Sequence, residues 1–205
     1  MEKRKIDTVI FDIGGVLTDY HTLDYFLGKG CTPEMAARLK AATMETPAWS
    51  EYDRGVLNDE EVRALFKQND PEIAEEIDRT LTSMTGMVTK REGSVPWIRE
   101  LQGRGLKVLV LSNFSETALR DCADALDFLK IVDGGIISCK EKLIKPDGAI
   151  YQLIIRRYGL DPARSVFIDD TQKNLDGAAI YAMRTIHFET EAQTRAELEP
   201  LISGR

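Results

Sequence analysis

The chain has 205 residues, of which 43% are hydrophobic and 30% charged, a balance typical of one globular domain or of one domain carrying an insertion. Its 34 acidic residues outnumber its 27 Lys and Arg residues and give a net charge of −7, which argues against a nucleic-acid partner because an acidic surface repels phosphate backbones. The apolar runs are too short to cross a bilayer, so we expect no membrane contact.

Cysteines and histidines exclude further classes of site. The three cysteines have no CxxC spacing, which fits reduced thiols in a cytoplasmic protein. Two histidines, His21 and His187, are too few for a tris-histidine metal site, and no motif supports a Ser/His/Asp triad. Acid–base or nucleophilic chemistry should therefore fall to carboxylates or to lysine.

The first part of the chain combines one strand with a long helical segment. Residues 6–11 form a short apolar run that ends at Asp12 and is followed by two glycines, which predicts a buried strand opening into a tight turn. From about Tyr20 to Arg91 the pattern is helical, and we expect no strands between these helices. Helix starts are predicted at Thr32-Pro33-Glu34, at Asn58 with Glu61, and at Asp70-Pro71-Glu72.

The rest of the chain alternates between helices and strands. Helices are predicted over residues 94–102, 116–126, 148–158 and 175–183, and strands over residues 106–111, 131–137, 165–168 and 185–188. This alternation predicts right-handed βαβ crossovers and a parallel sheet covered on both faces. The fold class is therefore α/β, a three-layer doubly wound parallel sheet with an all-helical insertion after its first strand.

Ligands of such sheets bind at the carboxyl ends of the strands. Four predicted strands are followed by polar residues, namely Asp12, Ser112-Asn113, Lys145-Pro146 and Asp169-Asp170. These loops hold three carboxylates, one lysine, and one hydroxyl followed by an amide. A carboxylate can attack phosphorus and form an aspartyl-phosphate, provided that its repulsion by the incoming dianion is offset.

The size of that repulsion indicates a metal ion. One carboxylate facing a dianion at about 4 Å and an effective dielectric near 20 costs roughly 8 kcal/mol. Asp12, Asp169 and Asp170 carry three negative charges, which Mg²⁺ and Lys145 together would balance. Magnesium suits the site because the available ligands are hard oxygens.

Together these segments resemble the four motifs of the haloacid dehalogenase superfamily of hydrolases. The matching residues are Val9-Ile-Phe-Asp12-Ile-Gly-Gly-Val-Leu17, Leu111-Ser112-Asn113, Lys145-Pro146, and Phe167-Ile-Asp-Asp170 followed by Asn174, Gly177 and Ala178. The resemblance covers nearly the whole chain and implies a Rossmannoid catalytic core over residues 1–18 and 92–205 with a helical cap over residues 19–91. Within the superfamily, the motifs are most similar to those of small sugar-phosphate phosphatases related to bacterial glucose-1-phosphatase, and of the amino-terminal phosphatase domain of soluble epoxide hydrolases.

By position, the resemblance also implies metal and nucleophile roles. Asp12 would be the nucleophile and a metal ligand, and the carbonyl of Gly14 a second ligand. Asp170 aligns with the acidic ligand of the fourth motif. Asp169 would be its supporting neighbour or an alternative ligand, and Asn174 a helper one helical turn further on.

The phosphate group would be held by residues of the same loops. The resemblance implies that Ser112 and the backbone amide of Asn113 bind phosphate, with Gly14 in the same cradle. Lys145 would hold the phosphate beside the nucleophile. Trp49, Tyr52 and Arg54 lie in the cap segment close to Gly55 and are candidate substrate contacts.

Gly14 departs from the pattern. Most phosphatases of the superfamily carry a second aspartate two positions after the nucleophile, which protonates the leaving alkoxide and then deprotonates water. Such proton transfer is typically worth about 10² to 10⁴ in rate. We therefore predict a substrate whose leaving group is already acidic, such as an anomeric sugar phosphate. Asp19 is a weaker substitute for the acid, because we expect it in the linker to the cap.

The sequence thus favours a Mg²⁺-dependent phosphatase that hydrolyses a small phosphorylated metabolite. One alternative is a 2-haloacid dehalogenase, in which Asp12 attacks carbon without a metal. Those enzymes usually carry an aromatic residue where Gly14 stands and do not need the paired acids at positions 169 and 170. The other alternative is a phosphate-binding or regulatory protein that has lost turnover together with the second aspartate.

Overall fold

Short apolar runs buried on both sides form the central sheet. The computed structural model describes residues 5–203. It contains β1 (Thr8–Phe11), β4 (Lys107–Ser112), β5 (Gly135–Ile137), β6 (Ser165–Asp169) and β7 (Arg184–His187), which pair in parallel in the order β5-β4-β1-β6-β7. Near-continuous Val, Ile and Leu suit these strands because neither face of the sheet meets water. The predicted parallel sheet is confirmed.

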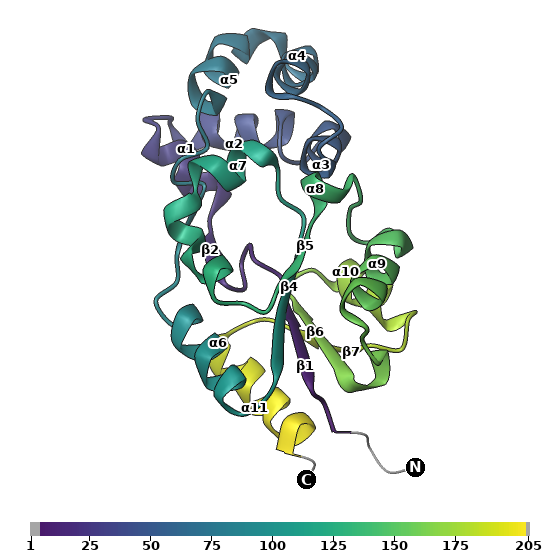
Figure 1. Ribbon diagram of the computed structural model, residues 1–205. Coiled ribbons are helices and arrows are strands. Elements are labelled where there is room, and N and C mark those ends of the chain that lie inside the picture. Colours follow the sequence, from purple (N-terminus) through teal and green to yellow (C-terminus); the bar gives the residue numbers. More distant parts are fainter. Residues whose placement is uncertain (1–4, 204–205) are drawn as a thin grey trace.

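Alternate side chains of each strand enter two different cores. Val9 and Phe11 of β1 face one core with α6 (Ser94–Gly103) and α11 (Glu191–Ser203), and the ring of Phe11 lies 4.8 Å from that of Trp97. Ile10 faces the other core, with α9 (Gly148–Tyr158) and α10 (Gln172–Ala179). The helices therefore cover both faces of the sheet and make three layers, as the alternation predicted (Figure 1).

A separate group of helices lies beyond the carboxyl ends of the strands (Figure 1). It comprises α1 (Thr22–Gly28), α2 (Pro33–Ala42), α3 (Pro47–Arg54), α4 (Asp59–Asn69) and α5 (Ala74–Leu81), the last preceded by a 3₁₀ turn over Pro71–Ile73. The predicted starts are confirmed at two caps: Thr32 accepts a hydrogen bond from the Met35 amide, and Asn58 forms a capping box with Glu61.

The expectation of no strands over residues 20–91 is wrong at both ends of that segment. Thr18–Tyr20 forms β2 and Val88–Lys90 forms β3, which pair antiparallel where the chain enters and leaves the helical group. Each strand has three residues, too few to show an alternating pattern. Their pairing depends on bringing distant segments together, which local sequence does not encode.

Several boundaries also differ from prediction. The helix expected over residues 116–126 is α7 (Glu116–Asp121) followed by a 3₁₀ segment, Ala123–Lys130, that is kinked at Leu126. Turns and bends occupy residues 131–133 after it, so β5 begins only at Gly135. A short helix, α8 (Ser138–Glu141), and the terminal α11 lie outside the predicted elements, and the helix expected over residues 175–183 runs as α10 from Gln172.

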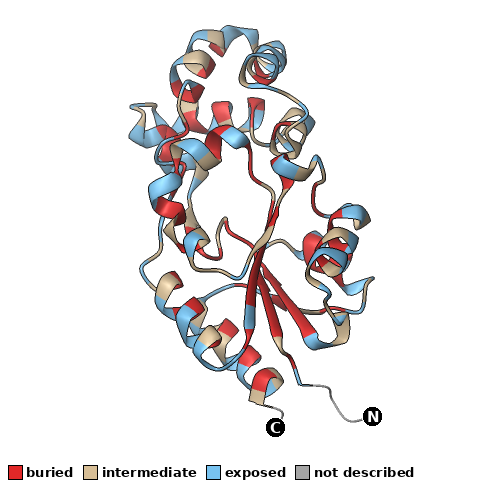
Figure 2. Ribbon diagram, in the orientation of Figure 1, coloured by how far each residue is buried: buried red, intermediate tan, exposed pale blue. Residues whose placement is uncertain are grey.

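The buried residues concentrate in the strands and on the inner faces of the helices (Figure 2). Within residues 5–203, none of the helices combines the length and the apolar character that a membrane span requires. The carboxyl ends of the sheet strands point toward α3 and the rest of the helical group (Figure 1), so the polar strand ends and this group face each other.

Candidate active site

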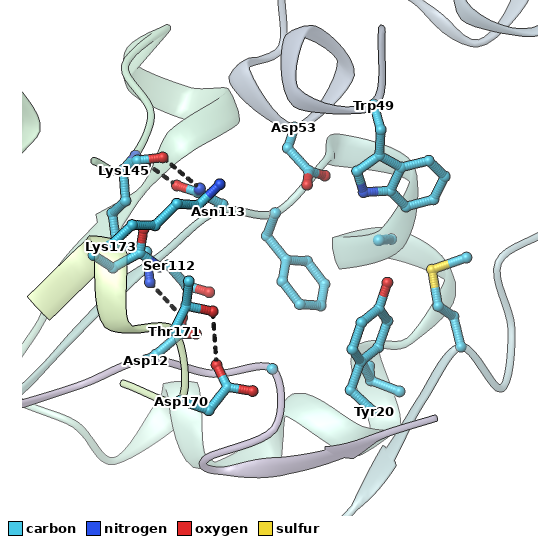
Figure 3. Close-up of a pocket in the computed structure, with 16 residues that line it drawn as sticks. Asp12, Tyr20, Trp49, Asp53, Ser112, Asn113, Lys145, Asp170, Thr171 and Lys173 are labelled. Carbon is cyan, nitrogen blue, oxygen red and sulfur yellow. Dashed lines mark hydrogen bonds and ion pairs between the residues drawn. The ribbon is translucent and has the colours of Figure 1, made fainter. Parts of the chain in front are cut away.

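The strand ends and the helical group enclose a cavity of about 280 Å³ (Figure 3). Of the predicted site residues, it is lined by Asp12, Gly14, Trp49, Ser112, Asn113, Lys145, Asp170 and Asn174. Residues that sequence reasoning did not single out add Tyr20, Asp53, Met87, Val88, Phe114, Ala118, Thr171 and Lys173. The loops after the strands are thus brought together as the parallel topology requires.

Lys145 joins two carboxylates at the base of the cavity. Its Nζ atom lies 2.8 Å from Asp12 Oδ1 and 2.6 Å from Asp169 Oδ2, and only 3% of the residue is exposed. Burial alone would lower the pKa of Lys145, but the two carboxylates raise it above its usual range. Burial raises the pKa of Asp12 to about 6 despite the opposing charge of Lys145, with repulsion from Asp169 adding to the rise.

Asp169 and Asp170 have different surroundings although they are adjacent. Asp169 is fully buried, and its two oxygens accept hydrogen bonds from the Thr171 amide at 2.8 Å and from Asn174 Nδ2 at 3.1 Å, besides the ion pair with Lys145. Asp170 is exposed to the cavity, where it accepts a hydrogen bond from the Thr171 hydroxyl at 3.2 Å. Asp169 is therefore committed to protein partners, whereas Asp170 is open to a ligand.

The glycine turn after β1 brings the backbone close to Asp170. Gly15 has a φ of +76°, and a Cβ atom built there would lie 2.4 Å from Asp170 Oδ2. Glycine is needed here for both the left-handed backbone and the close approach. Gly14, by contrast, lines the cavity, and a Cβ atom at that position would have no other atom within 4 Å.

Ser112 and Asn113 end β4 beside Lys145. Ser112 Oγ is buried beside the Asp12 carboxylate, whose pKa it helps to lower, and within the described part of the chain it has no well-aligned hydrogen-bond partner. The side chain of Asn113 donates to the Lys145 carbonyl at 3.0 Å and accepts from the Lys145 amide at 2.8 Å. This pair of bonds fixes the lysine loop against the end of β4.

The acidic group at the cavity has the composition of a magnesium site. Asp12, Asp169 and Asp170 each offer a carboxylate oxygen, and these oxygens all lie within 4.8 Å of one another. Burial and the neighbouring Asp169 raise the pKa of Asp170, so a cation there would relieve unfavourable charge. Asn174 Oδ1 is a further buried oxygen without a partner among residues 5–203. An all-oxygen donor set of this kind fits Mg²⁺.

Three other sequence candidates lie away from this cavity. Tyr52 is buried and donates to Asp59 Oδ1 at 2.6 Å, and Arg54 forms an ion pair with Asp147 at 2.9 Å. Asp19 is paired with Arg91 at 2.6 Å. These three side chains do not line the space next to Asp12.

Helical periodicity in the sequence could have identified Asp53, which does line the cavity. Trp49 and Asp53 are four positions apart in α3 and so share one helix face, which lines the cavity. Tyr52 and Arg54 flank Asp53 in sequence but project from other faces of the helix. Counting in fours from Trp49 would have selected Asp53 instead.

Residues 6–180 match the family model of the haloacid dehalogenase-like hydrolases, which is most of the chain. The chain belongs to this family. Over 193 residues, this haloacid dehalogenase-like hydrolase is 22% identical to the sesquiterpene phosphatase astK of Aspergillus oryzae, covering 94% of this chain and 95% of that protein.

Two solved structures show the shared fold. The hydrolase superposes on family enzyme bt-2542 of Bacteroides thetaiotaomicron, in complex with magnesium and inorganic phosphate, with a TM-score of 0.66 and 16% identity over 91% of this chain and 96% of that one. It superposes on L-2-haloacid dehalogenase of Xanthobacter autotrophicus with a TM-score of 0.64 and 17% identity, over 96% and 84% of the two chains. The family fold therefore accompanies both phosphate-binding and dehalogenating proteins.

Proposed function

We propose that this hydrolase is a Mg²⁺-dependent phosphatase that cleaves a small phosphorylated metabolite through an aspartyl-phosphate on Asp12. The observation that carries the proposal is the grouping of Asp12, Lys145 and Asp170 around one cavity, with Lys145 Nζ 2.8 Å from Asp12 Oδ1. A nucleophile, a cation and an open acidic ligand are the groups that phosphoryl transfer to a carboxylate requires.

Each residue has a distinct part in the reaction. Asp12 attacks phosphorus, while Lys145 holds the nucleophile in place and offsets the charge of the phosphate. The unpartnered Ser112 Oγ donates to a phosphate oxygen together with the Asn113 amide. Mg²⁺ held by Asp12, Asp170 and the Gly14 carbonyl would neutralise the anionic charge that gathers at the phosphoryl group. Asp169 and Asn174 keep Lys145 and the fourth motif in position.

The cavity supports a sugar phosphate as the substrate class. A volume of about 280 Å³ lies just below the usual range for small-molecule sites, roughly 300 to 1,000 Å³, which favours a small substrate. Trp49 and Phe114 line its wall and offer aromatic surface on which the apolar face of a sugar ring can pack. A small ester with a cyclic leaving group therefore suits both its size and its lining.

The test is a screen of phosphorylated metabolites with Mg²⁺ present, read out as release of inorganic phosphate. The panel should contain sugar 1-phosphates, sugar 6-phosphates and an isoprenoid monophosphate, the last because astK is a sesquiterpene phosphatase. We expect steady turnover of a sugar phosphate, abolished by Asp12→Asn. Asp7→Asn is the matched control, because Asp7 lies just before the opposite end of β1 and pairs with Arg164.

Two other results would contradict the proposal. Halide release from a 2-haloacid that survives EDTA would identify a dehalogenase that uses Asp12 on carbon. Phosphate binding without steady-state phosphate release from any ester in the panel would identify a non-catalytic member of the family. Neither outcome is compatible with a metal-dependent phosphatase.

A further inference from the structure

Asp53 places a carboxyl group in the cavity opposite the proposed nucleophile. It belongs to α3 of the helical group, and Figure 3 shows its side chain pointing into the cavity across from Asp12 and Asp170. It lies beside Trp49 on the wall that faces the strand ends. Neither the metal donors nor the phosphate-binding groups described above include it.

The reaction needs a proton donor on that side. In-line attack places the leaving oxygen on the far side of phosphorus from Asp12, and therefore toward the wall that α3 supplies. Gly14, which stands where related phosphatases carry their acid, has no side chain to donate a proton. A group on the opposite wall is placed to reach the leaving oxygen.

Among the ionisable residues described in the cavity lining, the others are less suited to this task. Asp12 and Lys145 form the ion pair at the nucleophile, and Asp170 is the open metal ligand. Burial raises the pKa of Tyr20 above its ordinary value, which makes its hydroxyl a weaker acid still. Lys173 is drawn on the same side as Lys145 and Asn113, where it can meet phosphate rather than the leaving group (Figure 3).

We propose that Asp53 is the general acid and general base of the phosphatase reaction. As Asp12 bonds to phosphorus and the ester P–O bond breaks, Asp53 transfers its proton to the departing oxygen and becomes a carboxylate. The carboxylate then takes a proton from the water that attacks the aspartyl-phosphate, the bond between phosphorus and Asp12 breaks, and inorganic phosphate is released. This inference rests on the phosphatase function proposed above.

The electrostatic surroundings of Asp53 suit proton transfer near neutral pH. Burial raises its pKa to about 7, although hydrogen bonds from the Ser115 backbone and the Trp49 side chain oppose the rise. Asp53 interacts electrostatically with Asp12 and Lys145 at the strand ends. It also raises the pKa values of Tyr20 on β2 and Cys139 on α8. A pKa close to the working pH gives both the acid and the base form in useful amounts.

Contacts between α3 and α8 hold Asp53 at the cavity. The Ser138 hydroxyl donates to the Asp53 carbonyl, and Lys142 Nζ donates to the Gly55 carbonyl just after the helix. The Arg54–Asp147 ion pair joins the same turn to the start of α9. The backbone on both sides of the carboxyl group is therefore fixed to the sheet domain, which fixes the proton donor relative to Asp12.

The decisive variant is Asp53→Asn, assayed with two esters in Mg²⁺. For an alkyl phosphate, whose leaving oxygen needs a proton, we expect kcat to fall about 10²- to 10⁴-fold. For 4-nitrophenyl phosphate, nitrophenolate leaves unprotonated, so its first turnover should change by less than about 10-fold. Hydrolysis of the aspartyl-phosphate should then be slow, giving a burst of nitrophenolate and an accumulated phosphoenzyme that intact-mass measurement detects.

A pH profile and a rescue add independent readouts. With the alkyl ester, kcat/KM of the wild type should fall as pH rises above about 7, because the acid form of Asp53 is lost, and this fall should be absent in Asp53→Asn. Adding Gly14→Asp to Asp53→Asn should restore part of the alkyl-ester turnover, because no atom lies within 4 Å of a Cβ at Gly14. Asp24→Asn, at an exposed position of α1, is the control for the same chemical change in the helical group.

The outcomes separate this inference from the function on which it rests. Equal losses of the first-turnover rate on both esters, a change in KM alone, or unchanged kinetics in Asp53→Asn with an active wild type would overturn the role of Asp53 and leave the phosphatase proposal standing. A wild type that hydrolyses no phosphate ester would overturn both.

Discussion

Lys145 shows how much of the site depends on single buried charges. Its ammonium lies between Asp12 and Asp169, at 2.8 Å and 2.6 Å, in a position almost closed to solvent. The family resemblance implied that Lys145 would hold phosphate beside Asp12. It did not predict the second ion pair, because the inward side chain of Asp169 is held by hydrogen bonds from Thr171 and Asn174 that the motif alone does not specify.

Replacing Lys145 with methionine should strongly destabilise the metal-free protein. The change leaves two buried carboxylates without their cation, and breaking a buried pair in this way typically costs about 3–5 kcal/mol. Urea unfolding at pH 7 in EDTA measures the loss, and phosphate release should also disappear. Lys173→Met, in the same cavity, should change the free energy of unfolding by less than about 0.5 kcal/mol. If Lys145→Met and Lys173→Met lowered the free energy of unfolding equally, the buried ion pairs would not stabilise the fold as described.

The raised pKa of Asp53 predicts how the free energy of unfolding changes with pH, whatever the enzyme's activity. Its pKa rises from an ordinary 3.8 to about 7 in the folded chain, so between these values the folded state binds more protons than the unfolded state. Stability from this group is therefore fully present below pH 3.8 and is lost as pH rises through 7. Between pH 5 and pH 8 the loss is on the order of 3 kcal/mol.

Asn at position 53 does not titrate, so Asp53→Asn should become more stable relative to the wild type as pH rises from about 5 to about 8. Urea unfolding of both proteins at the two pH values measures this difference. Asp24→Asn, at an exposed position of α1, provides the comparison for the same chemical change. A difference for Asp53→Asn that stays constant with pH would show that Asp53 is ionised throughout.

At the scale of elements, local sequence signals predicted where helices start but not which helices contact one another. Capping residues marked the starts of α2 and α4, and apolar runs marked the sheet strands. Strands β2 and β3 had no such signal, since each is short and pairs only with the other. The docking of α3 on α8 was equally hidden, and with it the position of Asp53.

Replacing Gly55 tests whether the contact between α3 and α8 matters for catalysis. It ends α3 with a φ of +78°, and a Cβ there would lie 2.7 Å from the Cys139 carbonyl oxygen and 2.8 Å from Lys142 Nζ. Gly55→Ala should therefore cost about 1–2 kcal/mol for the left-handed backbone and also move α3 away from α8, which lowers kcat by displacing Asp53. The measurements are urea unfolding and turnover of an alkyl phosphate.

Gly159→Ala is the matched control for this change. Gly159 ends α9 with a φ of +60°, but no atom lies within 4 Å of a Cβ at that position. We expect a similar cost in stability with kcat unchanged. If both variants lost stability equally and both kept wild-type kcat, the contact between α3 and α8 would have no part in catalysis.

At the scale of the whole molecule, the sequence was most informative where the topology is regular. Alternating helices and strands predicted the parallel sheet, and the parallel sheet predicted that Asp12, Ser112, Lys145 and Asp170 would meet at one edge. The opposite wall of the cavity comes from helices whose placement depends on tertiary contacts such as the Arg54–Asp147 ion pair. The placement of Asp53 opposite Asp12 therefore required the structure, although the spacing from Trp49 could have put it on the same helix face.

Magnesium should stabilise the folded chain as a whole, because the three carboxylates approach one another only when β1 and β6 are paired. An ion that binds the folded state alone adds about 2.7 kcal/mol at a concentration 100 times its Kd. For a chain of this length that corresponds to a rise in Tm of about 5–10 °C, reversed by EDTA. Calorimetry with and without Mg²⁺ measures this rise in Tm.

Asp170→Asn should lose most of the rise because it removes the open ligand, whereas Asp7→Asn should keep it. A Tm that Mg²⁺ leaves unchanged in the wild type at saturating concentration would show that the carboxylates repel one another without holding the ion.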